Sequence, residues 1–236
     1  MPSNLPHVIG VDIGTTSTKA VVFDLEGKVK GHHTAYYPLL TPAPGVAEQD
    51  PEEIFRATLA AIRGGVHAAG LAPADIKGVG FSAAMHSVIA VDDDGKPLTR
   101  SITWADTRAA AYADLILRDM DGHGIYLRTG TPIHPMSPLV KLLWLRKERG
   151  NVFREAVRFV GIKEYIFYRL FGRWLVDYSI ASATGLFNLQ KLDWDEGALA
   201  VAGITSDHLS KPAPPTHHVE GLDTATAADL GLPPGI

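Results

Sequence analysis

The chain has 236 residues, which suits one large domain or two small ones, and 46% of them are hydrophobic, enough for a substantial core. A net charge of −4, from 22 basic and 26 acidic residues, argues against a disordered chain and against a nucleic-acid-binding protein, which is normally basic. The absence of cysteine excludes disulfides, thiolate zinc sites and cysteine nucleophiles. Since residues 1–7 lack a secretory signal and no apolar stretch could span a membrane, we expect a soluble, cytoplasmic protein.

The N-terminal part of the chain predicts three antiparallel strands followed by a crossover helix. Short apolar segments at 7–11, 19–23 and 28–38 are joined by tight turns. A helix over 51–69 is predicted from the N-cap Asp50 and from apolar residues spaced by three and four. These apolar residues are Phe55, Leu59, Ile62, Val66 and Ala69. A strand at 76–81 follows, and a helix between strands favours a parallel crossover and an α/β sheet.

The remaining sequence predicts one more strand and four helices. The strand covers 88–91, and the helices cover 105–119, 138–148, 162–171 and 195–202. The proline-rich stretch 212–215 is typical of a surface connection.

The turn of the first hairpin carries the strongest local signal. The segment Asp12-Ile-Gly-Thr-Thr-Ser-Thr-Lys19 places a carboxylate, a glycine and four hydroxyl residues in one bend. Gly14 permits close approach of a ligand to the backbone, the hydroxyl and amide groups suit phosphate oxygens, and Asp12 suits hydrated Mg²⁺. An ordinary hairpin turn has a similar composition, so that alternative stays open. Neither a P-loop nor a dinucleotide-binding glycine motif is present.

Several segments together resemble one enzyme family. The hairpin turn is similar to the first phosphate motif of the actin, hexokinase and Hsp70 ATPase superfamily. Residues 136–148 resemble the N-terminal signature of the FGGY carbohydrate kinases, with matches at Met136, Pro138, Lys141, Trp144, Leu145, Lys147 and Glu148. Three further segments, 82–87, 129–138 and 176–185, resemble the gluconate kinases of that family more than its glycerol or xylulose kinases.

The resemblance implies a fold, a reaction and a domain organisation. The fold would be a ribonuclease-H-like α/β domain, with a mixed sheet flanked by helices. Residues 1–236 would form the N-terminal sugar-binding domain, with the C-terminal nucleotide-binding domain absent from this chain. The reaction would be phosphorylation of D-gluconate to 6-phosphogluconate, with ATP and Mg²⁺ as cofactors. We expect a sugar acid or polyol and ATP as small-molecule partners, no nucleic acid or membrane, and we leave homo-oligomers open.

The resemblance also implies a set of site residues. The phosphates of ATP would contact Gly14, Thr15, Thr16, Ser17 and Lys19, and Asp12 would serve the metal. The sugar would contact Met85, His86, Trp104, Asp106, Arg108, His134, Met136 and Asp177. Met136 stands where glycerol kinases carry a sugar-contacting tyrosine, which argues against glycerol. For a carboxylate on the sugar, the local cations are Arg108, His86 and His134.

For some of these residues an ordinary structural role stays open as an alternative. Asp106 could be the N-cap of the helix predicted at 105–119, and Arg108 could be solvated on that helix. Met85 and Met136 could be core residues, which is the commoner environment of methionine. For Lys141 and Trp144, which share one helical face, packing is favoured over direct contact with a ligand.

No residue of the chain is assigned as a catalytic base. The family places an aspartate just beyond a strand that follows a Gly-Leu-x-x-Gly turn. Here that turn is Gly231-Leu-Pro-Pro-Gly235, and the sequence ends at Ile236. We therefore expect this chain to be half of an enzyme that is inactive alone.

Two other function classes are alternatives. The segment Gly80-Phe-Ser82-Ala-Ala84 is one residue short of an esterase nucleophile elbow, with Asp177 and His217 as partners, but the sequence after it predicts a strand and not the required helix. A non-catalytic module of the same fold, binding a sugar or a partner, is the other alternative. The histidine pairs 32–33 and 217–218 lack a third ligand at zinc-site spacing.

Overall fold

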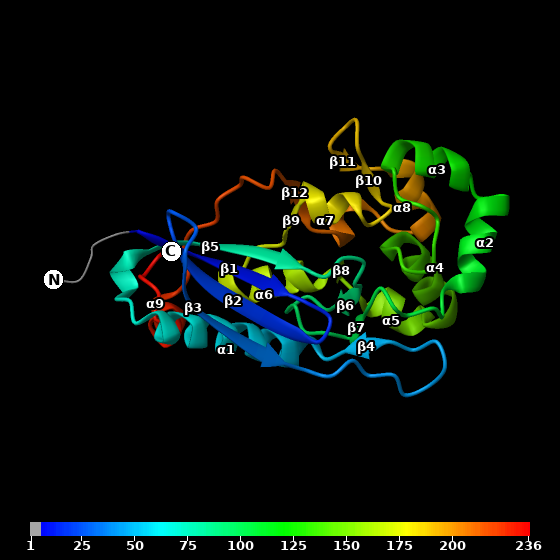
Figure 1. Ribbon diagram of the computed structural model, residues 1–236. Coiled ribbons are helices and arrows are strands. Elements are labelled where there is room, and N and C mark those ends of the chain that lie inside the picture. Colours follow the sequence, from blue (N-terminus) through cyan, green and yellow to red (C-terminus); the bar gives the residue numbers. More distant parts are fainter. Residues whose placement is uncertain (1–5) are drawn as a thin grey trace.

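The computed structural model describes residues 6–236, and its main feature is a four-stranded mixed sheet (Figure 1). The strands β1 (His7–Ile13), β2 (Ser17–Asp24) and β3 (Val29–Tyr36) run antiparallel, and β5 (Ile76–Ala83) pairs parallel to β1. The order is β3-β2-β1-β5. This confirms the three predicted antiparallel strands and the parallel crossover. Residues 1–5, where the sequence shows no secretory signal, lie outside the described residues.

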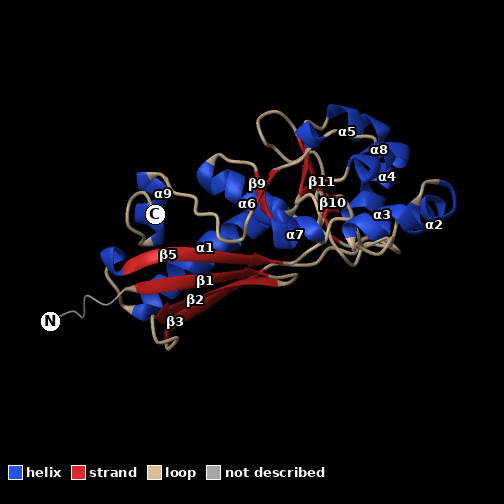
Figure 2. Cartoon of the chain, turned by 90° about the horizontal axis from the view of Figure 1, so that it is seen from above, coloured by secondary structure: helices blue, strands red, loops and turns tan. Residues whose placement is uncertain are grey.

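The crossover helix α1 (Pro51–Ala69) begins and ends as its sequence predicts. Asp50 accepts hydrogen bonds from the amides of Glu52 and Glu53 at 2.8 and 3.3 Å. Gly70 ends the helix in the left-handed conformation, with φ of 64°. The helix lies against one face of the sheet, along β2 and β3 (Figure 2). This leaves the opposite face of β1 and β2 free of α1.

The other elements are shorter. The helices are α2 (Ala110–Asp119), α3 (Gly122–Thr129), α4 (Pro138–Glu148), α5 (Gly150–Glu155), α6 (Ile162–Phe171), α7 (Tyr178–Ser182), α8 (Glu196–Ala202) and α9 (Thr224–Leu230). The strands are β4 (Glu48–Gln49), β6 (Ile89–Val91), β7 (Ser101–Ile102), β8 (Arg158–Val160), β9 (Leu175–Asp177), β10 (Phe187–Asn188), β11 (Asp193–Trp194) and β12 (Lys211–Ala213). No helix in the described part of the chain has both the length and the apolar character needed to cross a membrane.

Most predicted helices are confirmed, and one has a wrong start. The helices predicted at 138–148 and 162–171 match α4 and α6, and the one at 195–202 begins one residue later, after its N-cap Asp195. The helix predicted from 105 begins only at Ala110, because the preceding residues form turns. Asp106 is therefore not a helix N-cap.

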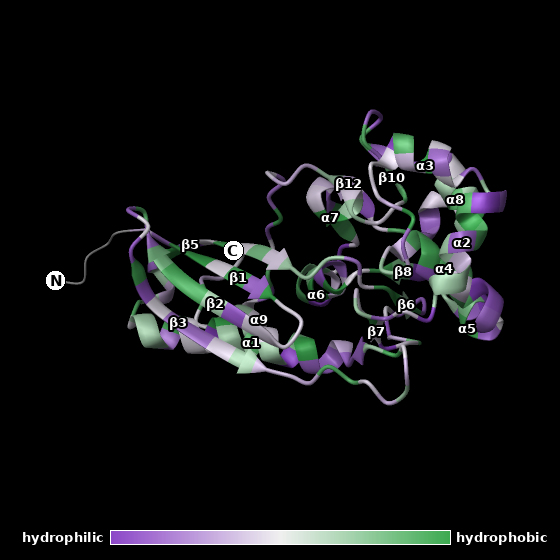
Figure 3. Cartoon of the chain, turned by 45° about the vertical axis from the view of Figure 1, so that its right-hand side comes forward, coloured by the Kyte–Doolittle hydropathy of each residue, from purple (hydrophilic) through white to green (hydrophobic). Residues whose placement is uncertain are grey.

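Two hydrophobic cores meet at the pair of strands β6 and β8. On β6, Ile89 and Val91 face the core under the sheet, whereas Ala90, like Val88 just before the strand, faces a second core among the helices. We call the first region the sheet half; it comprises β1, β2, β3, β5, α1, α6 and α9. The second region is the helical half; it comprises α2, α3, α4, α5, α7 and α8. In Figure 3, β3 is largely hydrophilic, which suits its place at the edge of the sheet.

Candidate functional site

The turn between β1 and β2 leaves amide groups available for a ligand. The Gly14 amide donates to the Ser17 carbonyl at 2.9 Å and closes the turn. The carbonyls of Thr15 and Thr16 point back into the protein, where they accept from the Gln49 side-chain amide (2.7 Å) and the Tyr37 backbone amide (3.1 Å). Within residues 6–236, the amides of Thr15 and Thr16 donate no hydrogen bond. Two backbone donors in one bend fit the oxygens of a phosphate.

The Thr18 side chain supports this turn from inside the protein and does not face the side on which a ligand would bind. The side chain is fully buried, and its hydroxyl lies 3.1 Å from the Tyr37 hydroxyl, which donates to the Gly14 carbonyl at 2.8 Å. Burial raises the pKa of Tyr37 to about 12, so this contact is kept at all ordinary pH values. The expectation that Thr18 offers a hydroxyl to phosphate is therefore wrong. Strand alternation turns Ser17 and Lys19 to the opposite face.

Asp12 lies on the free face of the sheet. It is exposed, and it sits directly across from Lys19 on β2 and from Ser82 on β5. No group of three or more metal-ligating side chains occurs in the part of the chain that the structure describes. A lone carboxylate fits Mg²⁺, which keeps most of its water and takes one or two protein ligands. The exposed Lys19 adds a cation that fits a phosphate beside that ion.

Trp104 connects the phosphate-type turn with the predicted sugar segment. Its indole N–H donates to the Thr15 hydroxyl at 3.1 Å, while half of the residue remains exposed. Met85 is also exposed, two residues after β5 ends. The structure therefore brings two of the sugar-site candidates to the same end of the sheet as the β1–β2 turn.

His86 is held in a defined orientation. Its backbone adopts the left-handed conformation with φ of 67°, uncommon for a residue other than glycine. Ring atom Nδ1 lies 2.8 Å from the Ala183 carbonyl, so Nδ1 donates. Burial lowers the pKa of His86, which favours the neutral ring. A neutral ring that donates from Nδ1 presents Nε2 as an acceptor.

His134 has the opposite hydrogen-bonding pattern. Its Nδ1 accepts the Met136 backbone amide at 3.2 Å, so the neutral ring carries its proton on Nε2. The side chain is exposed, and it lies near enough to His86 to contribute to the lowered pKa of that ring. The two imidazoles thus offer one acceptor and one donor. Met136 is partly buried in the turn beside His134.

Asp106 and Arg108 bind each other and the protein. Asp106 is 1% exposed, and its carboxylate accepts from the Ala47 amide at 3.0 Å and from the Arg108 amide at 3.1 Å. Arg108 forms ion pairs with Asp106 (2.7 Å) and Glu48 (2.5 Å), and stacks 4.5 Å over the Trp144 ring. Both groups thus already have protein partners, and their contact with a sugar stays a prediction. Glu48 lies 60 residues away from Arg108 in the sequence, so no local pattern predicts this pair.

Asp177 lies apart from the other candidates. It is the N-cap of α7, accepting the Ile180 amide at 3.2 Å, and it pairs with Lys163 at 2.6 Å. It lines a cavity of about 610 Å³ beside β1 and β5, whose lining includes no other predicted sugar residue. Ser82 belongs to the continuous strand β5, which leads into a turn and β6, so the esterase alternative lacks its nucleophile elbow.

The comparisons with known proteins decide the family. Residues 7–236 match the family model described as the FGGY family of carbohydrate kinases, N-terminal domain. The chain belongs to the FGGY family of carbohydrate kinases. The gluconokinase of Bacillus subtilis (strain 168) is 49% identical over 233 residues, which are 97% of this chain and 44% of that relative. The chain thus spans less than half of this relative.

Solved structures agree with the FGGY assignment. The gluconate kinase from Lactobacillus acidophilus superposes with a TM-score of 0.93 and 37% identity, over 98% of this chain and 46% of that one. A ligand-bound xylulose kinase from the same organism gives the same TM-score, identity and coverage. The expected ribonuclease-H-like α/β fold, with a mixed sheet flanked by helices, is confirmed.

Proposed function

We propose that this chain is the sugar-binding N-terminal domain of an ATP-dependent gluconate kinase, which converts D-gluconate to 6-phosphogluconate. The 49% identity to the Bacillus subtilis gluconokinase over almost the whole chain carries this proposal. The hydrogen bond that joins Trp104 of the predicted sugar segment to Thr15 of the phosphate-type turn supports it.

MgATP would supply the transferred phosphoryl group and a cation that neutralises charge on it. Asp12 would hold the ion through its water shell. The amides of Thr15 and Thr16 would bind phosphate oxygens, together with Gly14, Ser17 and Lys19 of the same hairpin. Catalysis of this kind depends on positioning, which a closed and internally bonded turn provides.

The sugar would lie between Trp104 and the two imidazoles. The exposed face of Trp104 and the Met85 side chain suit the C–H surface of an extended polyol. His86 Nε2 would accept a hydrogen bond from a hydroxyl group, and the His134 Nε2–H would donate to the carboxylate. Asp106 and Arg108 would act by holding the 45–48 loop, and Met136 by shaping the turn. Asp177 lies in a separate cavity, so it would contact the sugar only after a movement that brings the two regions together.

We assign none of the described residues as the catalytic base, and we expect no turnover from these 236 residues alone. Loss of a general base costs about 10² to 10⁴ in rate. A coupled assay on the isolated chain that shows turnover at about 1 to 100 s⁻¹ would contradict this expectation. A cytoplasmic location and self-association stay predictions from the sequence.

Titration of the ¹⁵N-labelled chain with D-gluconate, D-xylulose and glycerol tests the substrate. We expect D-gluconate to bind at least about tenfold more tightly than the other two, which corresponds to one hydrogen bond to a charged group. His86→Ala should weaken D-gluconate binding about tenfold, whereas the control His123→Ala, an exposed histidine on α3, should not change it. Absence of binding to all three sugars would favour a non-catalytic module that binds a partner instead of a sugar.

A xylulose kinase is the second candidate, because the Lactobacillus acidophilus xylulose kinase superposes equally well. D-xylulose is uncharged and needs no donor for a carboxylate. Tighter binding of D-xylulose than of D-gluconate, with no effect of His134→Ala, would establish this candidate in place of the first.

A further inference from the structure

Lys141 is a fully buried cation in the middle of an apolar helix. The residue is 0% exposed, and its neighbours on α4 from Leu139 to Leu145 are buried as well. Burial of an ammonium group costs several kcal/mol, so its position requires compensating contacts. A methionine or leucine would fill the same space at no such cost. The charged head of Lys141 therefore has a role that packing alone does not explain.

The Lys141 ammonium joins two turns of the candidate sugar site. Its Nζ donates to the His86 carbonyl at 2.6 Å and to the Met136 carbonyl at 2.8 Å. The His86 turn follows β5 of the sheet half, and the Met136 turn precedes α4 of the helical half. Lys141 is thus the link through which the two imidazole-bearing turns are held at a fixed separation.

The contact to His86 also stabilises a costly backbone conformation. A left-handed residue other than glycine costs about 1 kcal/mol or more. At His86 this conformation is held by the ammonium on the carbonyl and by the Ala183 carbonyl on the ring. Without Lys141, only the ring contact with Ala183 remains to hold this backbone conformation.

The charges around Lys141 come from several elements. Asp106 and Arg108 face Lys141 from the loop before α2; Asp106 raises the pKa of Lys141 and Arg108 lowers it. His86 lies beside Lys141 on the turn after β5. None of the described carboxylates forms an ion pair with Nζ. Burial lowers the pKa of Lys141 to about 7. The ammonium is therefore held mainly by carbonyl dipoles.

We propose that Lys141 is a positioning residue of the sugar site, whose ammonium ties the His86 turn to the Met136 turn and sets the geometry between the His86 acceptor and the His134 donor. This inference rests on the proposed function for the identity of the sugar. The link between the turns stands on the two hydrogen bonds of Lys141.

The first arm of the test needs no sugar. In the wild-type chain at about pH 5.5, below the lowered pKa of Lys141, the ammonium should give a slowly exchanging ¹H–¹⁵N signal with cross-peaks to residues of both turns, because it is buried and hydrogen-bonded. In Lys141→Met, the amides of Ser87 and Ser137, which follow the two carbonyls, should shift and exchange at least tenfold faster. The control Lys147→Met removes an exposed lysine from the same helix and should change neither amide.

The second arm measures D-gluconate affinity. We expect at least tenfold weaker binding in Lys141→Met and unchanged binding in Lys147→Met. Unaltered affinity in Lys141→Met, or absence of the slow ammonium signal in the wild type, would overturn the proposal. The wild-type signal decides the matter even where Lys141→Met does not fold. If the wild type binds no D-gluconate, the substrate assignment fails, whereas the first arm still decides whether Lys141 holds the turns.

Discussion

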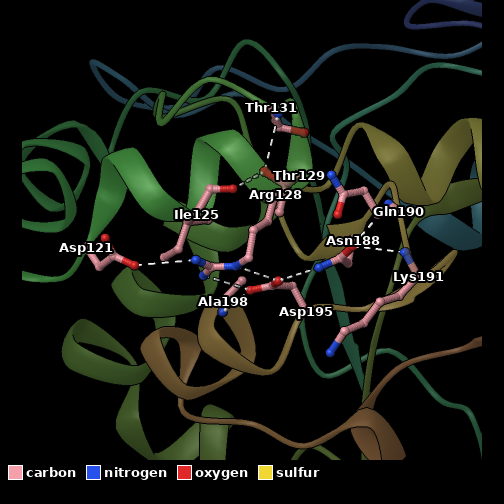
Figure 4. Close-up of polar contacts among 10 residues, drawn as sticks. All are labelled: Asp121, Ile125, Arg128, Thr129, Thr131, Asn188, Gln190, Lys191, Asp195 and Ala198. Atoms are coloured by element: carbon pink, nitrogen blue, oxygen red, sulfur yellow. Dashed lines mark hydrogen bonds and ion pairs between the residues drawn. The ribbon is translucent and has the colours of Figure 1, made fainter.

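The sheet half and the helical half are stabilised by different kinds of contact. In the sheet half, backbone pairing between four strands and an apolar face of α1 provide most contacts. In the helical half, short helices pack around their own apolar core, and a network of polar side chains also connects three of its elements (Figure 4). Arg128 of α3 binds Asp195 at 2.8 Å, and Asp195 also accepts from Asn188 at 3.0 Å and from the Ala198 amide at 3.0 Å. One carboxylate thus connects α3, β10 and α8.

This network concentrates several polar contacts of the helical half on one side chain, Asp195. A strand ladder shares its stabilisation among many backbone bonds, so loss of one bond has a limited effect. A buried carboxylate that serves three partners leaves all of them unsatisfied when it is removed. Substitutions of equal chemistry should therefore differ in cost according to the half in which they lie.

The largest effect is expected at Asp195. Asp195→Ala removes the buried partner of Arg128 and the N-cap of α8, so we expect a loss of about 3 to 4 kcal/mol in the free energy of unfolding. Asp223→Ala, at the exposed N-cap of α9, should cost about 1 kcal/mol. Urea unfolding measures both. Equal losses at the two caps would mean that the polar network adds nothing beyond capping.

The second effect depends on pH and involves Glu164 of α6. Burial raises the pKa of Glu164 from 4.5 to about 7. Between these values the folded chain keeps a proton that the unfolded chain loses, so this group lowers stability as the pH rises from 4.5 to 7. The shift corresponds to about 3 kcal/mol. Above pH 7 the loss is complete.

Glu164→Gln should remove this pH dependence. The amide oxygen can still accept from the Gly161 backbone amide, which Glu164 binds at 2.7 Å. Unfolding curves at pH 5 and pH 7 should then differ less for the variant than for the wild type. For Lys141 of the helical half, the expected change in stability with pH has the opposite sign, because its lowered pKa makes stability rise between about pH 7 and 10.5. Parallel curves for wild type and Glu164→Gln would show that Glu164 titrates normally.

The same contrast explains what could be predicted from the sequence. The sheet half follows from local patterns, since Asp50, Gly70 and the apolar spacing of α1 are close in sequence to what they control. The polar network of the helical half joins residues far apart, such as Arg128 and Asp195, and no local pattern pairs them. The predicted start of α2 was wrong for this reason, because Asp106 binds the distant Ala47 amide and does not cap the helix.

The candidate site was predictable in part. The phosphate-type turn has a compact signature, and its hydroxyl and glycine residues indicated its position. The burial of Thr18 follows from strand alternation, which is a local pattern of the sequence. The commitment of Arg108 to Glu48 and the left-handed backbone of His86 depend on tertiary contacts. A lysine on an apolar helical face was the one available signal for Lys141.

A third, smaller effect tests the packing of the sheet half. A Cβ atom on Gly31 of β3 would lie 2.4 Å from the backbone nitrogen of Ala69 on α1. Gly31→Ala should therefore force the strand and the helix apart and cost about 2 kcal/mol. Gly78→Ala on β5 is the control, because a Cβ atom there meets nothing within 4 Å and should change stability by less than about 0.5 kcal/mol. Thermal unfolding of the two variants compares them directly, and a neutral Gly31→Ala would mean that α1 is not tightly seated.

The smallest effect is expected where the two halves meet beside the candidate site. The Trp104 indole donates to the Thr15 hydroxyl at 3.1 Å, and it is half exposed, so water competes for this bond. A double-mutant cycle with Trp104→Phe and Thr15→Val should give a coupling energy of about 0.5 to 1 kcal/mol in urea unfolding. Phenylalanine keeps most of the ring and valine keeps the shape of threonine, so the cycle isolates the hydrogen bond. A coupling energy of zero would place the two halves in contact without this bond, and would leave the β1–β2 turn oriented by Gln49 and Tyr37 alone.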